Sequence, residues 1–403
     1  MSNTDTLDKL STKFYEATVR AFELLNQSIK VRTFFVGRTT EDSYTTLKVF
    51  SKIDGCQLTE GRTIPLQESY CNLIFSGKRE PLMIEDTSVH PIVSKLAATS
   101  RANIGSYLGV PIILEDHTMF GTLCAVDPSA HKFTNDDIEV MQTLANFISN
   151  AIELGAAFER ILIEEQRVKK ELNFAKIVQT SVLSEPVDLE NINISAYYQS
   201  SDSLSGDMYS WFEIAPNKYG IMLLDVMGHG VSAALISMSI RAVLRGFITN
   251  ISDPVEVMKE LNHHIYYLFN SNDQSTYATA IYIVVDTNLK TIEYANAGHP
   301  SGLLLLDGEA ITRMEEGCLI LGIFPEIQVN KQQFIYKDPS TVLLYTDGII
   351  ELITPVVNEG IKELENILTA NPNNGGLIEE IQRKYVNGKA LKDDVCLISI
   401  NVK

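Results

Sequence analysis

In the second half of this chain, an aspartate lies at or beside the end of an apolar, strand-like stretch four times. The stretches are SLSGDMYSWF with Asp207, IMLLDVMGHG with Asp225, LLYTDGII with Asp347, and VCLISI, which follows Asp393 and Asp394. One such aspartate is typical of an ordinary strand–turn connection. Four of them in one region predict that several strand ends converge and present carboxylates to one point.

Clustered carboxylates repel one another and are costly to remove from water unless a cation neutralises them. Hard oxygen ligands select Mg²⁺ or Mn²⁺, and no His or Cys has a spacing typical of a zinc site. Two such ions can position a water molecule and a phosphate oxygen, so the pattern favours metal-assisted hydrolysis of a phosphoryl group. The net charge of −18 argues against a nucleic-acid-binding surface.

A chain of 403 residues with 45% apolar residues has room for two or three packed domains. Its five cysteines are scattered, odd in number and without CxxC spacing, and the N-terminal sequence is polar. These features favour a cytoplasmic protein with free thiols. No apolar run approaches the ~20 residues that a membrane span needs.

The first part of the chain, residues 1–153, alternates between helical and strand patterns. Apolar spacing predicts a helix within residues 5–30, on Leu7, Leu10, Phe14, Ala17 and Leu24, and strands follow at 33–37, 44–51, 107–114 and 119–126. Thr134 and Asp137 form a capping-box pattern that opens a closing helix. This order predicts an α+β sensor domain.

The phrase YLGVPIIL…GTLCAVDPSAHKFTNDDIEVMQTLANFISNAIE resembles the GAF domain family over roughly residues 10–155. That resemblance implies either a small-molecule pocket beside the sheet or a domain that only dimerises. No cluster of residues names a ligand, so the GAF effector stays unknown.

Residues 154–184 are expected to form a helical linker. Apolar residues recur every seven positions, with charged residues between them, at Leu154, Ile161, Val168, Ala175 and Val182. This period favours a two-stranded coiled coil, and hence a parallel homodimer. An amphipathic helix that lies on one of the domains is the alternative.

Residues 185–403 hold the aspartates. Strand patterns are expected at 193–199, 219–226, 277–286, 291–298, 302–308, 340–348 and 394–402, and helices at 231–247 and 253–270. Strands, two helices and further strands predict an α+β fold of layered antiparallel sheets flanked by helices.

The ordered motifs SGD…LLDVMGHGVSAAL…ATAIYIVVD…YANAGHP…LLYTDGIIE…KDDV resemble the SpoIIE-like branch of the type 2C (PPM) metal-dependent Ser/Thr phosphatases. The resemblance implies two Mn²⁺ or Mg²⁺ ions. It assigns Asp225 to both ions and the Val226 backbone carbonyl to the first. Asp207 would serve the first ion, and Asp347 and Asp393 the second. These four aspartates are the expected catalytic residues.

Some assignments stay open. Asp394 is the alternative to Asp393 as a ligand. Gly206, Gly228 and Gly348 are expected to allow close backbone approach where a side chain would collide. The motifs depart from the family at Ser205-Gly206-Asp207 (usually Gly-Gly-Asp), at Ser210 (often Asp) and at Asp393-Asp394-Val395-Cys396 (usually Asp-Asp-Ile-Thr). These departures affect no residue assigned to a metal, but they put the rate and the metal affinity in doubt.

Two histidines are considered as auxiliary residues. His229 is either a general acid for the leaving alkoxide or a turn residue. His299 is expected to be a packing residue at a strand end.

The sequence therefore predicts a signal-regulated protein Ser/Thr phosphatase in which a GAF-like domain controls a two-metal hydrolase. By resemblance, the expected partner is a phosphorylated STAS-type anti-anti-sigma factor in a stress-response sigma pathway. The competing hypothesis is a catalytically weak phosphatase-fold scaffold, or a GAF sensor that acts by protein interaction.

Overall fold

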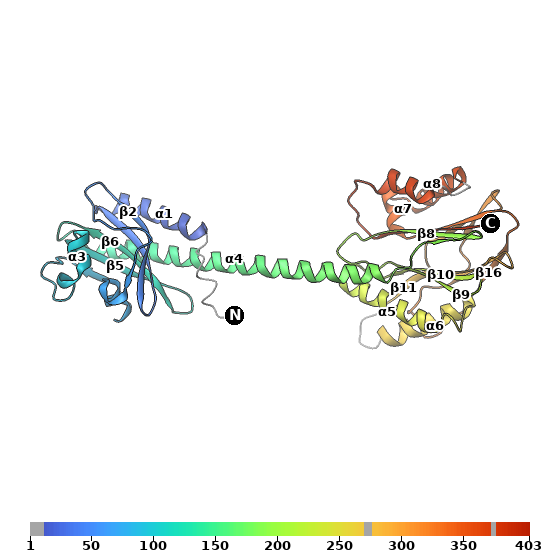
Figure 1. Cartoon of the computed structure of the whole chain (residues 1–403), viewed down its shortest axis with the longest axis horizontal. Helices are drawn as coiled ribbons and strands as arrows, with labels where there is room; N and C mark the ends of the chain where they lie inside the picture. Colours follow the sequence, from blue (N-terminus) through green and yellow to red (C-terminus); the bar gives the residue numbers. More distant parts are fainter. Residues whose placement is uncertain (1–11, 270–275, 372–375) are drawn as a thin grey trace. The chain divides into compact units, whose positions relative to one another are not determined.

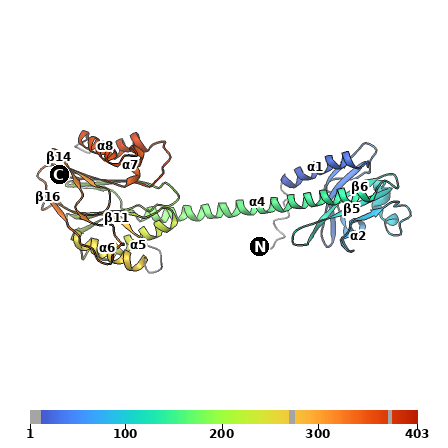
Figure 2. The same cartoon turned by 180° about the vertical axis from the view of Figure 1, so that it is seen from behind.

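The computed structural model describes residues 12–269, 276–371 and 376–403, and Figures 1 and 2 show it from opposite sides. The chain divides into two compact units, one ending at Arg167 and the other beginning at Val168. Helix α4 (Asn135–Ser181) belongs to both units, because the boundary falls within it. Each unit is described by itself below.

The N-terminal unit is built on one antiparallel sheet with the strand order β3-β2-β1-β6-β5-β4. One face packs against α1 and the first part of α4, and the other packs against α2 and α3. The elements are α1 (Thr12–Ser28), β1 (Thr33–Thr39), β2 (Ser43–Ser51), β3 (Thr63–Pro65), α2 (Cys71–Phe75), β4 (Leu82–Ile84), α3 (Ala97–Ala102), β5 (Ser106–Ile113) and β6 (Met119–Asp127), with short 3₁₀ turns at Leu66–Glu68 and Val93–Lys95.

The sequence predictions for this unit agree with the structure in their main elements. The four expected strands are β1, β2, β5 and β6. The backbone N–H and hydroxyl of Thr134 both donate to the Asp137 carboxylate at 2.8 and 2.9 Å, so the predicted cap is present at the start of α4. Leu7 and Leu10 of the expected first helix lie outside the described residues.

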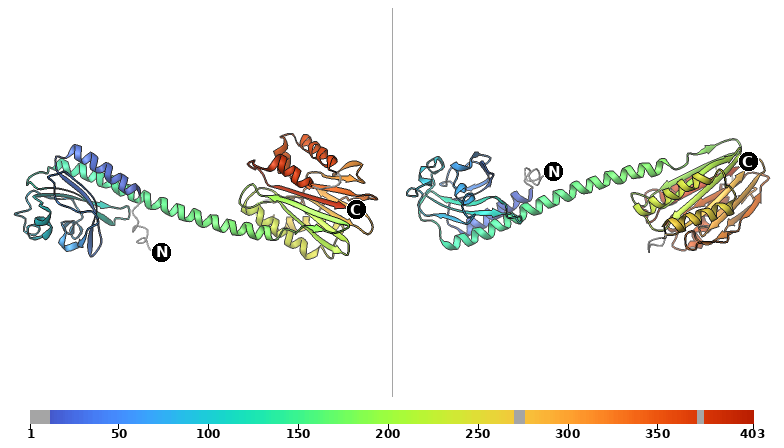
Figure 3. Two further views of the ribbon diagram at one scale, coloured as in Figure 1. Left: turned by 45° about the horizontal axis from the view of Figure 1, so that its top comes forward. Right: turned by 90° about the horizontal axis from the view of Figure 1, so that it is seen from below.

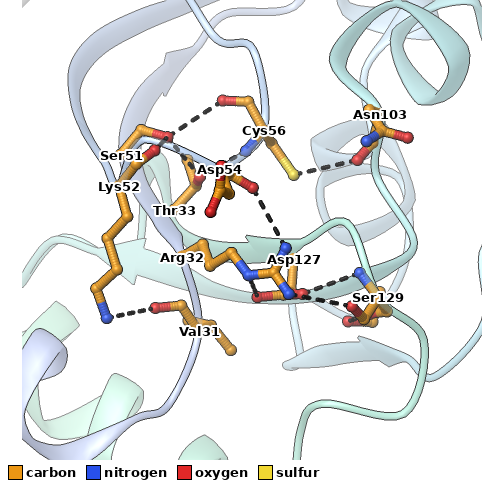
Figure 4. A network of polar contacts seen from close by, with 11 residues as sticks. Val31, Arg32, Thr33, Ser51, Lys52, Asp54, Cys56, Asn103, Asp127 and Ser129 are labelled. Atoms are coloured by element: carbon orange, nitrogen blue, oxygen red, sulfur yellow. Dashed lines mark hydrogen bonds and ion pairs between the residues drawn. The ribbon is translucent and has the colours of Figure 1, made fainter.

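A polar network holds one end of this sheet (Figure 4). The Arg32 guanidinium lies 3.6 Å from the buried Asp127 carboxylate and donates to the Asp54 carbonyl and the Ser129 hydroxyl. The Ser129 backbone N–H in turn donates to Asp127 at 2.9 Å. These contacts place a cation beside a buried carboxylate and tie the start of β1 to the end of β6.

The C-terminal unit contains two antiparallel-dominated sheets that face each other (Figure 3). One has the order β15-β12-β11-β10-β9, with β16 also paired to β12, and the other has the order β14-β13-β17-β18-β8-β7. Apolar side chains from both sheets form a shared core, as Leu223, Ile283, Val342 and Ile398 illustrate.

Helices cover the outer faces of both sheets. α5 and α6 lie on the first sheet, and α7, α8 and α9 lie on the second. The elements are β7 (Val187–Asp188), β8 (Ile192–Gln199), β9 (Met208–Ala215), β10 (Lys218–Val226), α5 (Val231–Phe247), α6 (Pro254–Phe269), β11 (Ala278–Asp286), β12 (Thr291–Ala297), β13 (Gly302–Leu306), β14 (Ala310–Met314), β15 (Gly317–Cys318), β16 (Gln332–Ile335), β17 (Ser340–Tyr345), α7 (Asp347–Ile353), α8 (Val357–Ala370), α9 (Leu377–Ile381), a π-helical turn (Gln382–Val386) and β18 (Val395–Val402).

The predicted fold class, α+β with layered antiparallel sheets flanked by helices, is confirmed. The expected closing helix and linker helix are one continuous helix, α4, because no proline occurs between its start and Pro186 and Gly155 is the only glycine within it. The division into residues 1–153, 154–184 and 185–403 stays a prediction. Among the described helices, none is both long and apolar enough to cross a membrane.

Candidate metal centre

Neighbouring antiparallel strands bring the predicted aspartates together in pairs. Asp225 lies at the end of β10, and Asp207 directly precedes β9, whose first residue, Met208, pairs with Leu224. In the other sheet, Asp347 follows β17 and Asp393 precedes β18. Because β17 and β18 are antiparallel partners, the end of one meets the start of the other. Each sheet therefore contributes carboxylates from one pair of strand ends.

At two glycines of the site, the backbone lies too close to a neighbouring segment for a side chain to fit. A Cβ on Gly206 would lie 2.8 Å from the Val226 carbonyl oxygen, and a Cβ on Gly348 would lie 2.0 Å from the Asp394 carbonyl oxygen. The expectation of a close approach was wrong for Gly228, where a Cβ would meet nothing within 4 Å. Gly228 is instead required by its φ of +86°, in the left-handed region that glycine adopts without strain.

The carboxylates perturb one another. Burial, together with the charges of Asp347 and Asp393, raises the pKa of Asp225 from 3.8 to about 7. Burial and the Asp225 charge raise the pKa of Asp207 well above its usual range, and burial followed by the Asp393 charge raises that of Asp347. Carboxylates from the two sheets therefore lie close enough to raise one another's pKa. Such mutual elevation is typical of carboxylates that share a site.

The cluster fits hard divalent cations. Asp207 is only 2% exposed, and its Oδ2 has no hydrogen-bond partner within the described structure. An orphaned, buried carboxylate oxygen is costly unless a cation or water meets it.

Among the described residues, no three or more His, Cys, Asp or Glu side chains lie close enough together to hold a metal ion in their present positions. The aspartates are nevertheless near enough to raise one another's pKa. Mg²⁺ keeps several water ligands and takes only one or two carboxylates, so it does not need a complete set of protein ligands.

Asp393 and Asp394 have different surroundings. Asp394 is 4% exposed, and its Oδ1 accepts hydrogen bonds from the backbone N–H and hydroxyl of Ser201 at 2.8 and 2.9 Å. Its Oδ2 accepts from the Gly206 N–H at 3.0 Å. Asp393 accepts one described bond, from the Asp394 N–H, and raises the pKa of Asp225 and Asp347. Asp394 therefore holds the loop that carries Asp207, and Asp393 has more oxygen lone pairs free.

The end of α4 holds the same loop. The Gln179 side chain is 1% exposed, donates to the Ser205 carbonyl at 2.7 Å and accepts from the Ser205 N–H at 3.2 Å. The Ser205 hydroxyl accepts from the Asp207 N–H at 3.0 Å, and Lys176 donates to the Ser200 hydroxyl at 3.0 Å. A change at the end of α4 is therefore only two hydrogen bonds from Asp207.

The two histidines differ in burial. His229 lies exposed in the turn before α5. His299 is buried, and its Nδ1 lies 2.9 Å from the hydroxyl of Thr279, the residue that pairs with Asp225 across β10 and β11. Burial lowers the pKa of His299 to about 3, so its ring is neutral. His299 supports the strand beside Asp225.

Sequence reasoning did not identify Gln179, Ser201 or Thr346 as supports of the site. The Thr346 hydroxyl, fully buried, accepts from the Cys396 N–H at 3.0 Å and lowers the pKa of Asp207 against the effect of burial. The available signal was a threonine directly before Asp347, whereas Gln179 lies outside the seven-residue row of the linker.

Two family models match the chain: the GAF domain over residues 33–152, and Stage II sporulation protein E (SpoIIE) over residues 215–403. Phosphoserine phosphatase RsbP of Bacillus subtilis is 34% identical over 241 residues, which cover 58% of this chain and 58% of RsbP. Phosphoserine phosphatase RsbU of B. subtilis is 26% identical over 247 residues, which cover 60% of this chain and 70% of RsbU. The chain thus spans little more than half of RsbP.

Among solved structures, the SiaA-PP2C domain of Pseudomonas aeruginosa aligns with a TM-score of 0.49 and 19% identity, covering 60% of this chain and 99% of that domain. The family matches coincide with the two folds described above, a sheet with helices on both faces and a layered pair of sheets. The chain therefore carries a GAF domain followed by a SpoIIE-type PP2C phosphatase domain, and it is homologous to RsbP and RsbU.

Proposed function

We propose that the chain is a protein Ser/Thr phosphatase that uses two Mn²⁺ or Mg²⁺ ions. The observation that carries this proposal is the cluster of mutually perturbed carboxylates, in which a buried Asp207 oxygen has no partner. Asp207, Asp225, Asp347, Asp393 and the Val226 carbonyl would hold the ions. When bound, the ions would activate water and offset negative charge on the phosphoryl oxygens.

The chain's own residues would prepare this site. Asp225 and Asp207 must be ionised to bind cations, and a bound cation lowers the raised pKa values that favour their protonated forms. Asp394 and Gln179 keep the loop of Asp207 in place through buried hydrogen bonds. His229 is exposed in the adjacent turn, where it could donate a proton to the leaving alkoxide.

The proposed substrate is a phosphorylated STAS-type anti-anti-sigma factor, with activation of a stress sigma factor as the output. The names of RsbP and RsbU, both phosphoserine phosphatases, support a phosphoserine substrate. The GAF domain would receive the signal, and α4 would transmit it to the loop of Asp207 through Gln179.

We also propose that α4 pairs in a parallel homodimer. Three side chains of the seven-residue row are exposed in the single chain: Leu154 at 65%, Ile161 at 63% and Val168 at 49%. Sedimentation of Ile161→Glu and Ile163→Glu tests this, because Ile163 is 60% exposed but lies outside the row. Dissociation by Ile161→Glu alone is expected, whereas a monomeric wild-type chain would exclude the dimer.

The decisive experiment for activity is hydrolysis of p-nitrophenyl phosphate and of a phosphoserine protein by the full chain, with and without Mn²⁺. Turnover that requires the metal is the expected result. If neither substrate is hydrolysed at any metal concentration, the scaffold hypothesis is favoured instead.

A further inference from the structure

A second cluster of reactive side chains lies in the GAF domain, away from the carboxylates. Cys71, the first residue of α2, and Cys124 of β6 place their Sγ atoms 3.9 Å apart. The Thr122 hydroxyl lies 3.0 Å from the Cys71 sulfur and 3.2 Å from the Cys124 sulfur, and the Tyr107 hydroxyl lies 3.3 Å from Cys124. Cys71 is 1% exposed, and Cys124 is fully buried.

A cavity of about 80 Å³ reaches one of the two thiols. Its wall includes Cys71 but not Cys124, and the other lining residues include Phe35, Tyr44, Leu58 and Tyr70. Because one water molecule needs ~10–15 Å³ of such space, the cavity admits a small molecule. A reagent that enters it meets Cys71 first, with Cys124 behind.

The surroundings distinguish the two thiols chemically. Burial raises the pKa of Cys71, but hydrogen bonds from Cys124, Thr122, Tyr44 and Tyr107 outweigh it, so the net shift is downward. Burial, followed by the hydrogen bond to Cys71, raises the pKa of Cys124 well above its usual range. Hydroxyl and thiol donors around one sulfur are the arrangement that favours a thiolate.

We propose that Cys71 and Cys124 are a reversible oxidation site for a small hydroperoxide that enters the GAF cavity. The Cys71 thiolate attacks the distal oxygen of the peroxide, so an S–O bond forms, the O–O bond breaks, and the departing alkoxide or hydroxide takes up a proton. The Cys124 thiol then attacks the Cys71 sulfur, so an S–S bond forms and the S–O bond breaks, and the departing hydroxide takes up the Cys124 proton and leaves as water. The dithiol loses two electrons and two protons, and the peroxide is reduced to an alcohol and water.

Little movement is required. A disulfide bond is ~2.05 Å long, so the two sulfurs, now 3.9 Å apart, must approach by roughly 2 Å. Thiols in a reducing compartment would return the disulfide to the dithiol.

The other cysteines lack this arrangement. The Cys56 thiol donates to the Asn103 carbonyl at 3.4 Å within the polar network of Figure 4, and burial raises its pKa to about 12. Burial raises the pKa of Cys318 to about 11 and that of Cys396 well above its usual range. We therefore expect a hydroperoxide to oxidise Cys71 and Cys124 in preference to the other three free cysteines.

The test is to treat the full chain under native conditions with hydrogen peroxide or tert-butyl hydroperoxide, block free thiols and map peptides without reduction. The expected product is a peptide pair linked through Cys71 and Cys124, with the loss of two hydrogens, which dithiothreitol reverses. In Cys124→Ser, dimedone should label Cys71, and in Cys71→Ser it should leave Cys124 unlabelled.

Cys318→Ser is the control variant and should form the Cys71–Cys124 link as the wild type does. The wild-type map needs no substitution, so the test holds even if a variant fails to fold. An unmodified Cys71 in a chain whose Cys318 or Cys56 is oxidised would overturn the proposal, as would oxidation of Cys71 that stops without the Cys124 link.

Discussion

The two units of this chain bury titratable clusters of opposite character. In the GAF domain, thiols and hydroxyls contact one another, and burial keeps Tyr107 and Cys124 neutral by raising their pKa values. In the phosphatase domain, Asp207 and Asp225 also have raised pKa values, but each partner that raises them is another carboxylate. The thiols and hydroxyls of the GAF cluster contact one another within hydrogen-bond distance, whereas the carboxylates of the acidic cluster repel one another, a repulsion that the proposed cations would offset. Burying the ionised carboxylates therefore lowers the folding stability of the phosphatase domain, whereas the thiol cluster adds no comparable cost to the GAF domain.

The largest effect is expected from removing charge in the acidic cluster. Asp225→Asn and Asp347→Asn should each lower Mn²⁺-dependent turnover by at least ~100-fold, since even outer-shell changes at metal sites cost 10–100-fold. Asp202→Asn is the matched control, because Asp202 is an exposed aspartate of the same loop. The measurement is hydrolysis across a Mn²⁺ titration, and near-wild-type turnover at saturating metal would remove that residue from the site.

A comparison of Asp394→Asn with Asp393→Asn separates support from metal binding. In Asp394→Asn, an amide N–H would face the N–H donors of Ser201 or Gly206, so we expect a loss of ~2 kcal/mol of unfolding free energy. Asp393→Asn should leave the metal-free stability nearly unchanged but raise the Mn²⁺ concentration needed for activity. Denaturant unfolding and Mn²⁺ titration of both variants are the measurements. If Asp393→Asn lost stability and Asp394→Asn needed more Mn²⁺, then Asp394 would be the metal ligand and Asp393 the structural support.

The metal-free phosphatase domain should lose stability as the pH rises from about 4 to 7. The folded pKa of Asp225, about 7, lies above its ordinary value of 3.8, so the folded state holds a proton that the unfolded state has released. The penalty for ionising the buried group is complete above pH 7 and amounts to a few kcal/mol, at ~1.4 kcal/mol per pKa unit. Unfolding in chelator is followed by Trp211, the only tryptophan, which lies on β9. Asp225→Asn should flatten the profile, and an equally steep profile in that variant would refute this cause.

The smallest effect concerns the contact between α4 and the site. Gln179→Leu removes both hydrogen bonds to Ser205, so we expect the Mn²⁺ concentration for half-maximal activity to rise several-fold, equivalent to ~1 kcal/mol. Turnover at saturating metal should change little. Gln166→Leu, at an exposed position of the same helix, is the control. If the two variants have the same metal dependence, Gln179 does not position the loop.

Strand alternation and the positions of glycines were enough to predict β1, β2, β5 and β6 and most strands of the phosphatase domain, as well as α5 and α6. The helices α7, α8 and α9 were not predicted, although Ile361, Leu364 and Leu368 form a buried helical face on α8. With 7 and 5 residues, α7 and α9 are too short for a helical period to be recognised, whereas the 14 residues of α8 carry apolar side chains at helical spacing and could have been predicted.

The carboxylates of the site could be predicted because each is next to a recognisable strand. Their supports could not, because Gln179 and Ser205 meet only when the end of α4 packs beside the loop before β9. The pairing of Cys71 with Cys124 is likewise long-range, since it joins a helix to a strand 53 residues later. Sequence spacing carries no information about such contacts.

The central claim is that the four-aspartate cluster binds the metal ions that the phosphatase domain needs. The most direct test is thermal unfolding of the full chain by Trp211 fluorescence in chelator and in Mn²⁺, for the wild type and Asp225→Asn. The account predicts stabilisation of the wild type by ~2.7 kcal/mol at about 100 times the dissociation constant, and little or none in the variant. A wild-type transition that is indifferent to millimolar Mn²⁺, or an equal shift in Asp225→Asn, would contradict it.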